Sequence, residues 1–296
     1  MCRLFGMSGG SNEVQATFWL LDAATSLVAL SETQPDGVGL GTFQPDGTPR
    51  IYRKPVAANR SQTFIADAHE VSSRTFLAHI RHATAGEPTI ENTHPFEQDG
   101  RLFAHNGVVG DLPALRERLG AHAELVQGST DSELYFTLMT KRIEEHGGDI
   151  AAGITHAARE LADEITLYSL NMLLTTPTDV WALRYPETNE LWVLERSIAA
   201  LGGPGGGVDF DQRAMSGITR VFSGQLSIRP ATIIASQPMD TNPLWRLLEP
   251  GELVHVDPSL RVTSTIAVPD PPARMLELTP KEEAAQQEEP APGAGP

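Results

Sequence analysis

The chain opens with MCRLFGMSG, residues 1–9, in which a cysteine at position 2 stands directly before a run that favours a β-strand, Arg3 to Ser8. Because the Cys2 side chain is small, we expect the initiator methionine to be removed. The free α-amino group of Cys2, with a pKa of about 7.7–8.0, would then serve as the general base for its own thiol. The opening stretch predicts a nucleophile next to a strand, although a lone cysteine is more often a small buried hydrophobic residue.

The second informative stretch is AHIRHATAGEPTIENTHPF, Ala78 to Phe96. Arg81 follows a short apolar run, so we expect it where a strand leaves its sheet. An arginine there is either a surface ion-pair partner or a planar, bidentate clamp for a carboxylate. His79, His82 and His94 raise the alternative of a zinc hydrolase, but they lack the i,i+3 or i,i+4 spacing of ligands on a helix. Structural or hydrogen-bonding roles are favoured for them, and no metal or cofactor is expected.

Two further motifs each allow a structural and a functional interpretation. In FAHNGVVGD, Phe103 to Asp111, the pair Asn106-Gly107 is typical of a hairpin turn, but its side-chain amide and backbone N–H could also form an oxyanion hole. In GSTDSELYF, Gly128 to Phe136, Asp131 either caps a helix or holds an ammonium group of a ligand.

The hydrophobic pattern predicts short strands, then two long adjacent helices, then strands again, which favours an α+β sandwich over regular βαβ alternation. The strands are expected at 3–8, 37–42, 75–79, 102–105, 170–175, 180–184, 191–195 and 232–236. The helices are expected at Asn12–Leu30, Asp111–Leu119, Ser132–His146 and Asp149–Glu164. Asp111, two residues before Pro113, is a good helix start.

Composition limits the classes of partner and compartment. The chain has 296 residues with 22 Lys+Arg and 38 Asp+Glu, a net charge of −16 that disfavours nucleic acid and anionic membranes as partners. No apolar run approaches the roughly 20 residues of a membrane-spanning helix, and one cysteine excludes an internal disulfide, so a cytoplasmic location is expected. We expect residues 1–268 to form one domain, with a flexible loop at Leu201–Phe210, and residues 269–296 to form a disordered acidic tail.

Taken together and in this order, the motifs resemble the glutaminase domain of the class II glutamine amidotransferases, which are N-terminal-nucleophile hydrolases. The motifs are MCRLFGMSG, PDGVGLG (Pro35 to Gly41), HIRHATAGEPTIENTHPF, HNGVV and STDSELYF, with ASQPMD (Ala235 to Asp240), Trp245 and PGELVHV (Pro250 to Val256) near the end. The resemblance covers Cys2 to Val268 and implies a four-layer αββα sandwich. It is nearest to the stand-alone members, among them the γ-glutamyl amidohydrolases of ergothioneine biosynthesis.

The resemblance also implies a role for each matching residue. Cys2 corresponds to the nucleophile, and Asn106 and Gly107 to the oxyanion hole. Arg81 corresponds to the arginine that binds the substrate α-carboxylate, with Thr84 beside it, and Asp131 to the acid that holds the α-amino group. His82, Ala85 and Val38 depart from residues frequent in the family, and these departures are expected to affect pocket walls.

The resulting hypothesis is hydrolysis of glutamine or a γ-glutamyl amide through a thioester at Cys2, releasing ammonia or an amine. Two alternatives stay open: a glutaminase subunit that donates ammonia to a partner synthetase, and a non-catalytic glutamine-binding domain. The leaving group, the partner and the oligomeric state are not indicated by the sequence.

Overall fold

Two antiparallel sheets form the centre of the molecule. The computed structural model describes residues 2–23, 25–32, 34–82, 87–196 and 230–279. Within these ranges, one sheet has the strand order β11-β9-β10-β1-β4-β2-β3 and the other the order β13-β12-β8-β7-β6-β5. The paired neighbours all run antiparallel.

The first sheet, which contains the N-terminal strand, consists of β1 (Arg3–Ser8), β2 (Gly37–Phe43), β3 (Pro49–Lys54), β4 (Thr75–Arg81), β9 (Trp192–Arg196), β10 (Ala231–Ala235) and β11 (Arg246–Leu247). The second consists of β5 (Phe96–Gln98), β6 (Arg101–Val109), β7 (Leu167–Thr175), β8 (Val180–Leu183), β12 (Glu252–Val256) and β13 (Val262–Ile266). The helices are α1 (Leu27–Leu30), α2 (Gln62–Glu70), α3 (Leu112–Leu119), α4 (Asp131–Glu145) and α5 (Ile150–Glu164). None of the described helices is long and apolar enough to cross a lipid bilayer.

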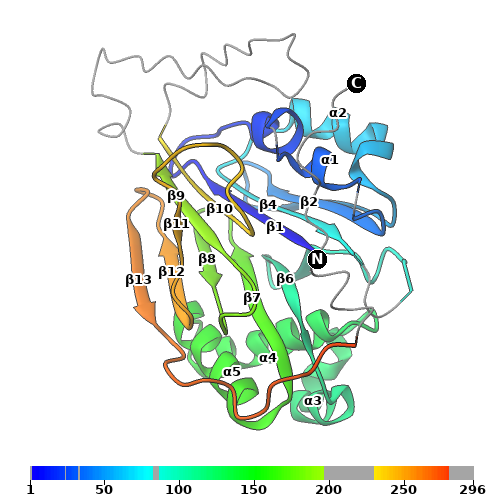
Figure 1. Ribbon diagram of the computed structural model, residues 1–296, viewed down its shortest axis with the longest axis vertical. Helices are drawn as coiled ribbons and strands as arrows, with labels where there is room; N and C mark the ends of the chain where they lie inside the picture. Colours follow the sequence, from blue (N-terminus) through cyan, green and yellow to red (C-terminus); the bar gives the residue numbers. More distant parts are fainter. Residues whose placement is uncertain (1, 24, 33, 83–86, 197–229, 280–296) are drawn as a thin grey trace.

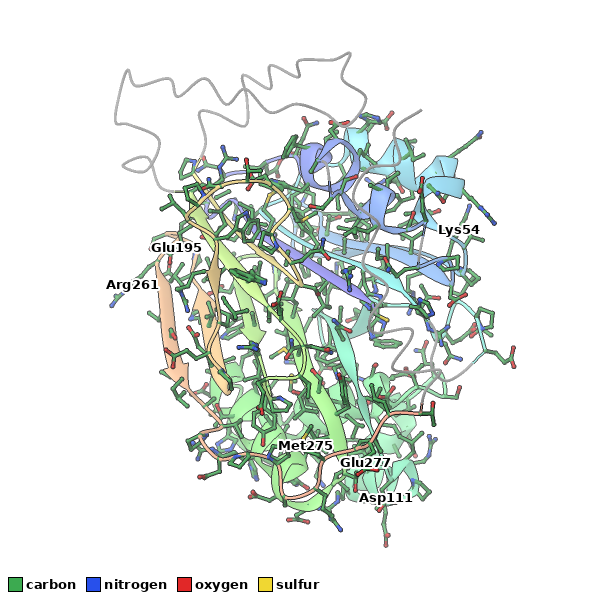
Figure 2. The ribbon with its side chains drawn as sticks, in the orientation of Figure 1. Lys54, Asp111, Glu195, Arg261, Met275 and Glu277 are labelled. Carbon is green, nitrogen blue, oxygen red and sulfur yellow. The ribbon has the colours of Figure 1, made fainter. Side chains whose placement is uncertain are left out.

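Three hydrophobic cores separate four layers (Figure 1). Helices α1 and α2 cover the outer face of the first sheet, around Phe64 and Trp19. Helices α3 to α5 cover the outer face of the second sheet, around Phe136 and Leu161. The third core lies between the two sheets and includes Leu77. Charged side chains such as Lys54, Glu195 and Arg261 lie on the outside (Figure 2). The predicted α+β, four-layer αββα architecture is confirmed.

Local signals predicted most elements correctly. All eight expected strands are present, and Asp111 caps α3 by accepting a hydrogen bond from the Ala114 N–H. The expected helix over Asn12–Leu30 is wrong: this stretch contains a π-helical turn at Phe18–Asp22 and the four-residue α1, with Val14 in an isolated β-bridge. Its apolar residues pack against α2 and the first sheet as separate turns rather than as one continuous face.

Glycine in the PDGVGLG motif allows two backbones to approach closely. A Cβ atom on Gly39, in β2, would lie 1.8 Å from the carbonyl oxygen of His94. A Cβ on Gly37, two residues earlier on the same strand, would meet nothing nearer than 3.4 Å. Gly39 therefore lets the segment that leads from β4 to β5 pack directly on the first sheet.

The C-terminal segment begins with ordered contacts. Ala273 N–H donates to the carbonyl oxygen of Ala162 in α5, and Leu276 N–H donates to that of Leu167 in β7. Residues 270–276, assigned from the sequence to a flexible tail, thus run along the second sheet and its helices (Figure 1). Residues 280–296 and the predicted loop at Leu201–Phe210 lie outside the described residues, and the division at residue 268 stays a prediction.

Candidate functional site

The ends of β1 and β4 bring Cys2 and Arg81 together between the sheets. Side chains alternate along a strand, and Leu4 and Leu77 belong to the core between the sheets. Cys2 and Arg81, at even spacings from them, therefore face the same inter-sheet space. The register pairs Arg3 with Ile80, so Cys2 lies opposite Arg81 where both strands end. The expectation that Arg81 sits at a strand end is confirmed.

The Cys2 thiol is held by the backbone that follows Arg81. The His82 N–H donates to Sγ at 3.3 Å, and Sγ lies 3.5 Å from the His82 carbonyl oxygen. Burial raises the pKa of the Cys2 thiol above its ordinary value, and the His82 hydrogen bond and the charges of Arg81 and Arg3 act in the opposite direction. Because the net shift is upward, the thiol is protonated at neutral pH and needs a base before it can attack.

Arg81 is a buried cation whose planar group reaches across a loop. Its side chain is only 4% exposed, and Nη1 donates to the carbonyl oxygen of Glu87 at 3.2 Å. Asn92 Nδ2 donates to the same oxygen at 3.1 Å. The loop that follows β4 is thus anchored on Arg81 at one end and on Asn92 at the other. Thr84 and Ala85, both within this loop, lie outside the described residues.

Asn106 and Gly107 lie inside strand β6, so the hairpin-turn interpretation is wrong. Leu102 and Ala104 of β6 face the inter-sheet core, whereas Phe103 faces the helices. By the same alternation, the Asn106 side chain points into the space that Cys2 and Arg81 also face. Asn106 is 2% exposed, and its Nδ2 has no hydrogen-bond partner among the described residues.

Gly107 is required by a close cross-strand contact. A Cβ at this position would lie 1.9 Å from the carbonyl oxygen of Ser169 in β7 and 2.6 Å from Nε2 of His105. The same Ser169 oxygen is 2.9 Å from His105 Nε2. Only glycine allows β6 and β7 to approach this closely, and it leaves the Gly107 backbone partly exposed beside buried Asn106.

Asp131 begins helix α4 but is not its cap. Thr130 is the N-cap, with its hydroxyl accepting the Glu133 N–H. Asp131 Oδ2 instead accepts the N–H of Val109 at 2.8 Å, which ties the helix to the end of β6. Because a carboxylate can accept about four hydrogen bonds, Asp131 retains acceptor capacity for a ligand. The residue that it bonds, Val109, lies three residues along β6 from Asn106.

Three buried histidines, His79, His94 and His105, lie near the site but are not arranged as metal ligands. The rings of His79 and His94 are in contact, with their centroids 4.2 Å apart and their planes tilted by 42°, and His105 bonds the Ser132 hydroxyl through Nδ1 at 2.9 Å. Burial lowers the pKa of His79 to about 3 and that of His94 well below its ordinary value. His82 lies instead against Cys2. No group of three or more His, Cys, Asp or Glu side chains in the described part of the chain could hold a metal ion.

Sequence reasoning missed three residues that shape the site. Asn92 Oδ1 accepts the Ser129 N–H at 2.9 Å and joins the loop after β4 to the loop before α4. Glu133 accepts the N–H groups of Gln127 and Gly128 in that second loop. His105 links β6 to α4 and β7. All three stand within the quoted motifs. The partners of Asn92 and His105 are distant in sequence and gave no local signal, whereas those of Glu133 lie five and six residues before it.

One interpretation of the sequence departures is corrected by the packing. Val38, expected in a pocket wall, is fully buried in the core between the first sheet and its helices. Its side chain points away from the space that holds Cys2, Arg81 and Asn106. A change in size at position 38 therefore alters the helix-facing core and not the pocket surface.

Comparison of the sequence with known proteins finds relatives of this chain. Residues 1–277 match the family described as class-II glutamine amidotransferases. A Haemophilus influenzae protein whose name assigns it to the glutamine amidotransferases is 28% identical, over 91% of this chain and 88% of its own. The Escherichia coli protein YafJ, named in the same class, is 30% identical, over 85% of this chain and 96% of its own.

Solved structures support the fold. A glutamine aminotransferase class-II domain protein from Silicibacter pomeroyi aligns with a TM-score of 0.59 at 20% identity, covering 89% of this chain and 97% of that one. The glutamine phosphoribosylpyrophosphate amidotransferase of B. subtilis aligns with a TM-score of 0.61 at 16% identity, covering 91% of this chain but 50% of that one. At these identities the likeness shows a shared fold.

Proposed function

The chain belongs to the class-II glutamine amidotransferase family, enzymes that act on the amide of glutamine, and on this premise we propose that it hydrolyses glutamine or a γ-glutamyl amide through a thioester at Cys2. The products would be glutamate and either ammonia, from glutamine, or an amine, from a γ-glutamyl amide. The observation that carries the proposal is the buried Asn106 Nδ2, which has no partner among the described residues and faces the same space as Cys2.

An unpaired buried donor is costly, by about 1–3 kcal/mol, so a protein retains one where a ligand atom uses it. In acyl transfer that atom is the oxygen that becomes negative when a nucleophile adds to the carbonyl. The Gly107 N–H, on the next residue of β6, would supply the second donor. Two donors on one rigid strand need no reorganisation as the charge develops.

The proposed reaction needs one base and no metal or cofactor. With Met1 removed, the α-amino group of Cys2 takes the thiol proton, and Sγ adds to the amide carbon. The tetrahedral intermediate collapses with cleavage of the C–N bond, and the leaving nitrogen takes the proton. Water then adds to the thioester, its proton passing to the same amino group, and cleavage of the C–S bond returns the thiol.

The two charged groups suit the two ends of a γ-glutamyl substrate. The Arg81 guanidinium would bind the α-carboxylate, exchanging its contact with the Glu87 carbonyl for a charged, bidentate one. Asp131 would accept from the α-ammonium group. A substrate that lacked one of these charges would lose the corresponding ionic hydrogen bond, which supplies selectivity. Thr84 is proposed beside the α-carboxylate from the family resemblance alone.

The decisive experiment is intact mass of protein with a native N-terminus, before and after exposure to a diazoketone analogue of glutamine. We expect a mass lacking Met1 and one covalent adduct, which disappears in Cys2→Ala. The Cys2→Ala protein should still bind glutamine in calorimetry. Retained Met1, or no adduct at saturating reagent, would overturn the catalytic proposal and leave a glutamine-binding domain.

Delivery of ammonia to a partner protein is the second candidate. Its support is that this chain aligns with half of the B. subtilis amidotransferase and with 20% of the glutamine–fructose-6-phosphate aminotransferase of Pectobacterium atrosepticum. In such a case glutamine turnover should rise when the partner and its own substrate are present. Release of free ammonia at an unchanged rate in cell extract and in purified protein favours a stand-alone hydrolase.

A further inference from the structure

The peptide group between Asn106 and Gly107 has two ends with different tasks. Its N–H belongs to Gly107 and is the backbone donor proposed for the oxyanion. Its carbonyl oxygen belongs to Asn106 and receives two side-chain hydrogen bonds, each at 3.2 Å, from Ser169 Oγ and Asn189 Nδ2. Both donors are buried and come from different parts of the chain, β7 and the β8–β9 connection.

We propose that Ser169 and Asn189 are positioning residues of the oxyanion hole, which orient and polarise the Asn106–Gly107 peptide through its carbonyl oxygen. The inference rests on the proposed function. Hydrogen bonds on the carbonyl oxygen draw electron density from the amide nitrogen, so the N–H becomes a stronger donor, by about 10–30% per bond. They also fix the plane of the peptide and hence the direction of the Gly107 N–H.

The Ser169 hydroxyl has a defined direction. Its oxygen accepts the Asn171 N–H at 3.2 Å, so its single proton is free to point at the Asn106 carbonyl oxygen. The Ser169 carbonyl oxygen lies against Gly107 and His105 Nε2. One residue of β7 thus contacts the oxyanion peptide at its carbonyl end and beside its glycine.

Asn189 is held in place by a buried polar network. Asn171, opposite Asn106 in the β6–β7 register, donates through Nδ2 to the Asn189 carbonyl oxygen at 3.1 Å. Arg184 Nε donates to the same oxygen at 2.9 Å, and its other nitrogens bind the carbonyl oxygens of Leu248 and Glu187. These contacts fix the connection after β8 so that the Asn189 amide points at the Asn106 carbonyl oxygen of β6.

The Asn189 amide is oriented with its donor toward Asn106. Its Nδ2 donates to the Asn106 carbonyl oxygen, while its Oδ1 is buried without a hydrogen-bond partner among the described residues. The side-chain amide of Asn189 therefore acts on its surroundings through its donor, and the acceptor of that donor is the oxyanion peptide.

The test is steady-state hydrolysis of glutamine and of γ-glutamyl p-nitroanilide by Asn189→Leu and Ser169→Ala. Leucine keeps the number and branching of the heavy atoms of asparagine, with bulkier methyl groups, and removes its donor. We expect kcat to fall about 3- to 10-fold in each variant with KM within twofold, and the double variant to fall further than either one. The loss from Asn189→Leu should persist in an Asn106→Ala background, because it acts through the Gly107 N–H and not through the Asn106 side chain.

A matched control is Gln98→Leu, which removes a buried amide from β5 of the same sheet, where it bonds only the Thr137 hydroxyl among the described residues. It should lower Tm and leave kcat unchanged. If kcat of both Asn189→Leu and Ser169→Ala equals that of wild type, or if only KM rises, the inference is overturned. If Asn189→Leu does not fold, Ser169→Ala alone decides. A wild-type protein with no turnover and no Cys2 adduct overturns the proposed function itself.

Discussion

At the scale of single residues, Asp131 has a structural bond and a proposed substrate contact on one carboxylate. Asp131→Asn keeps an oxygen for the Val109 N–H and removes the charge, whereas Asp131→Ala removes both. We expect KM for glutamine to rise about 10- to 150-fold in both variants, since a hydrogen bond to a charged group contributes about 1.5–3 kcal/mol. Only the alanine variant should also lower Tm. An asparagine variant with wild-type KM would remove Asp131 from the substrate site.

Asn106 is the residue whose substitution should affect the chemical step most strongly relative to substrate binding. Asn106→Ala should lower kcat by about 10²–10³ and leave KM little changed, because the amide acts on charge that develops in the transition state. Ammonia release measured against the inactive Cys2→Ala background gives the required sensitivity. Full kcat in Asn106→Ala would show that the oxyanion is held by other groups.

Sequence motifs predicted which residues meet, but not how each is held. Cys2, Arg81 and Asn106 face one space because strand alternation is a local property that can be counted along the chain. The Asp131 bond to Val109 and the Asn189 bond to Asn106 join residues 22 and 83 positions apart. Such contacts depend on the tertiary arrangement and carry no local signature.

At the scale of elements, strand β2 offers an internal comparison between two glycines. Gly39→Ala should lower the free energy of unfolding by at least about 2 kcal/mol, because its Cβ would overlap the His94 carbonyl oxygen, which is backbone and cannot move aside. Gly37→Ala should change it by less than about 1 kcal/mol, since its nearest contact is an ordinary 3.4 Å. Urea unfolding of the two variants checks the difference, and equal losses would contradict the proposed close approach.

Elements were predictable where their period was sustained. Helices α4 and α5 follow long amphipathic patterns and were expected within one or two residues of their observed bounds. The short strands β5 and β11, of three and two residues, carry too little pattern to detect. Residues 12–30 are apolar enough for a helix, but tertiary packing divides them into turns, which local propensity cannot foresee.

At the scale of the whole molecule, packing two sheets face to face buries polar groups along with the site. His79 and His94 lie between the layers, 0% and 4% exposed, and desolvation keeps both rings neutral. The architecture thus encloses the strands of the site from both sides, but its interior includes imidazole side chains, His79 and His94 among them, that an unfolded chain would protonate near pH 6.5.

This burial predicts acid sensitivity. Below pH 6.5 the unfolded chain binds protons at His79 and His94, whereas in the native state His79 does not do so until the pH approaches about 3. The free energy of unfolding therefore decreases as the pH decreases. Well below pH 6.5, each histidine should contribute a loss approaching about 1.4 kcal/mol per pH unit. Urea unfolding between pH 5 and 7 follows this slope, which toward pH 5 should be shallower by about one proton in His79→Asn. The control Gln98→Leu, which lacks a titrating group, should lower stability equally at every pH. An unchanged slope in His79→Asn would mean that the acid sensitivity arises elsewhere, because the slope does not depend on how much stability the substitution itself removes.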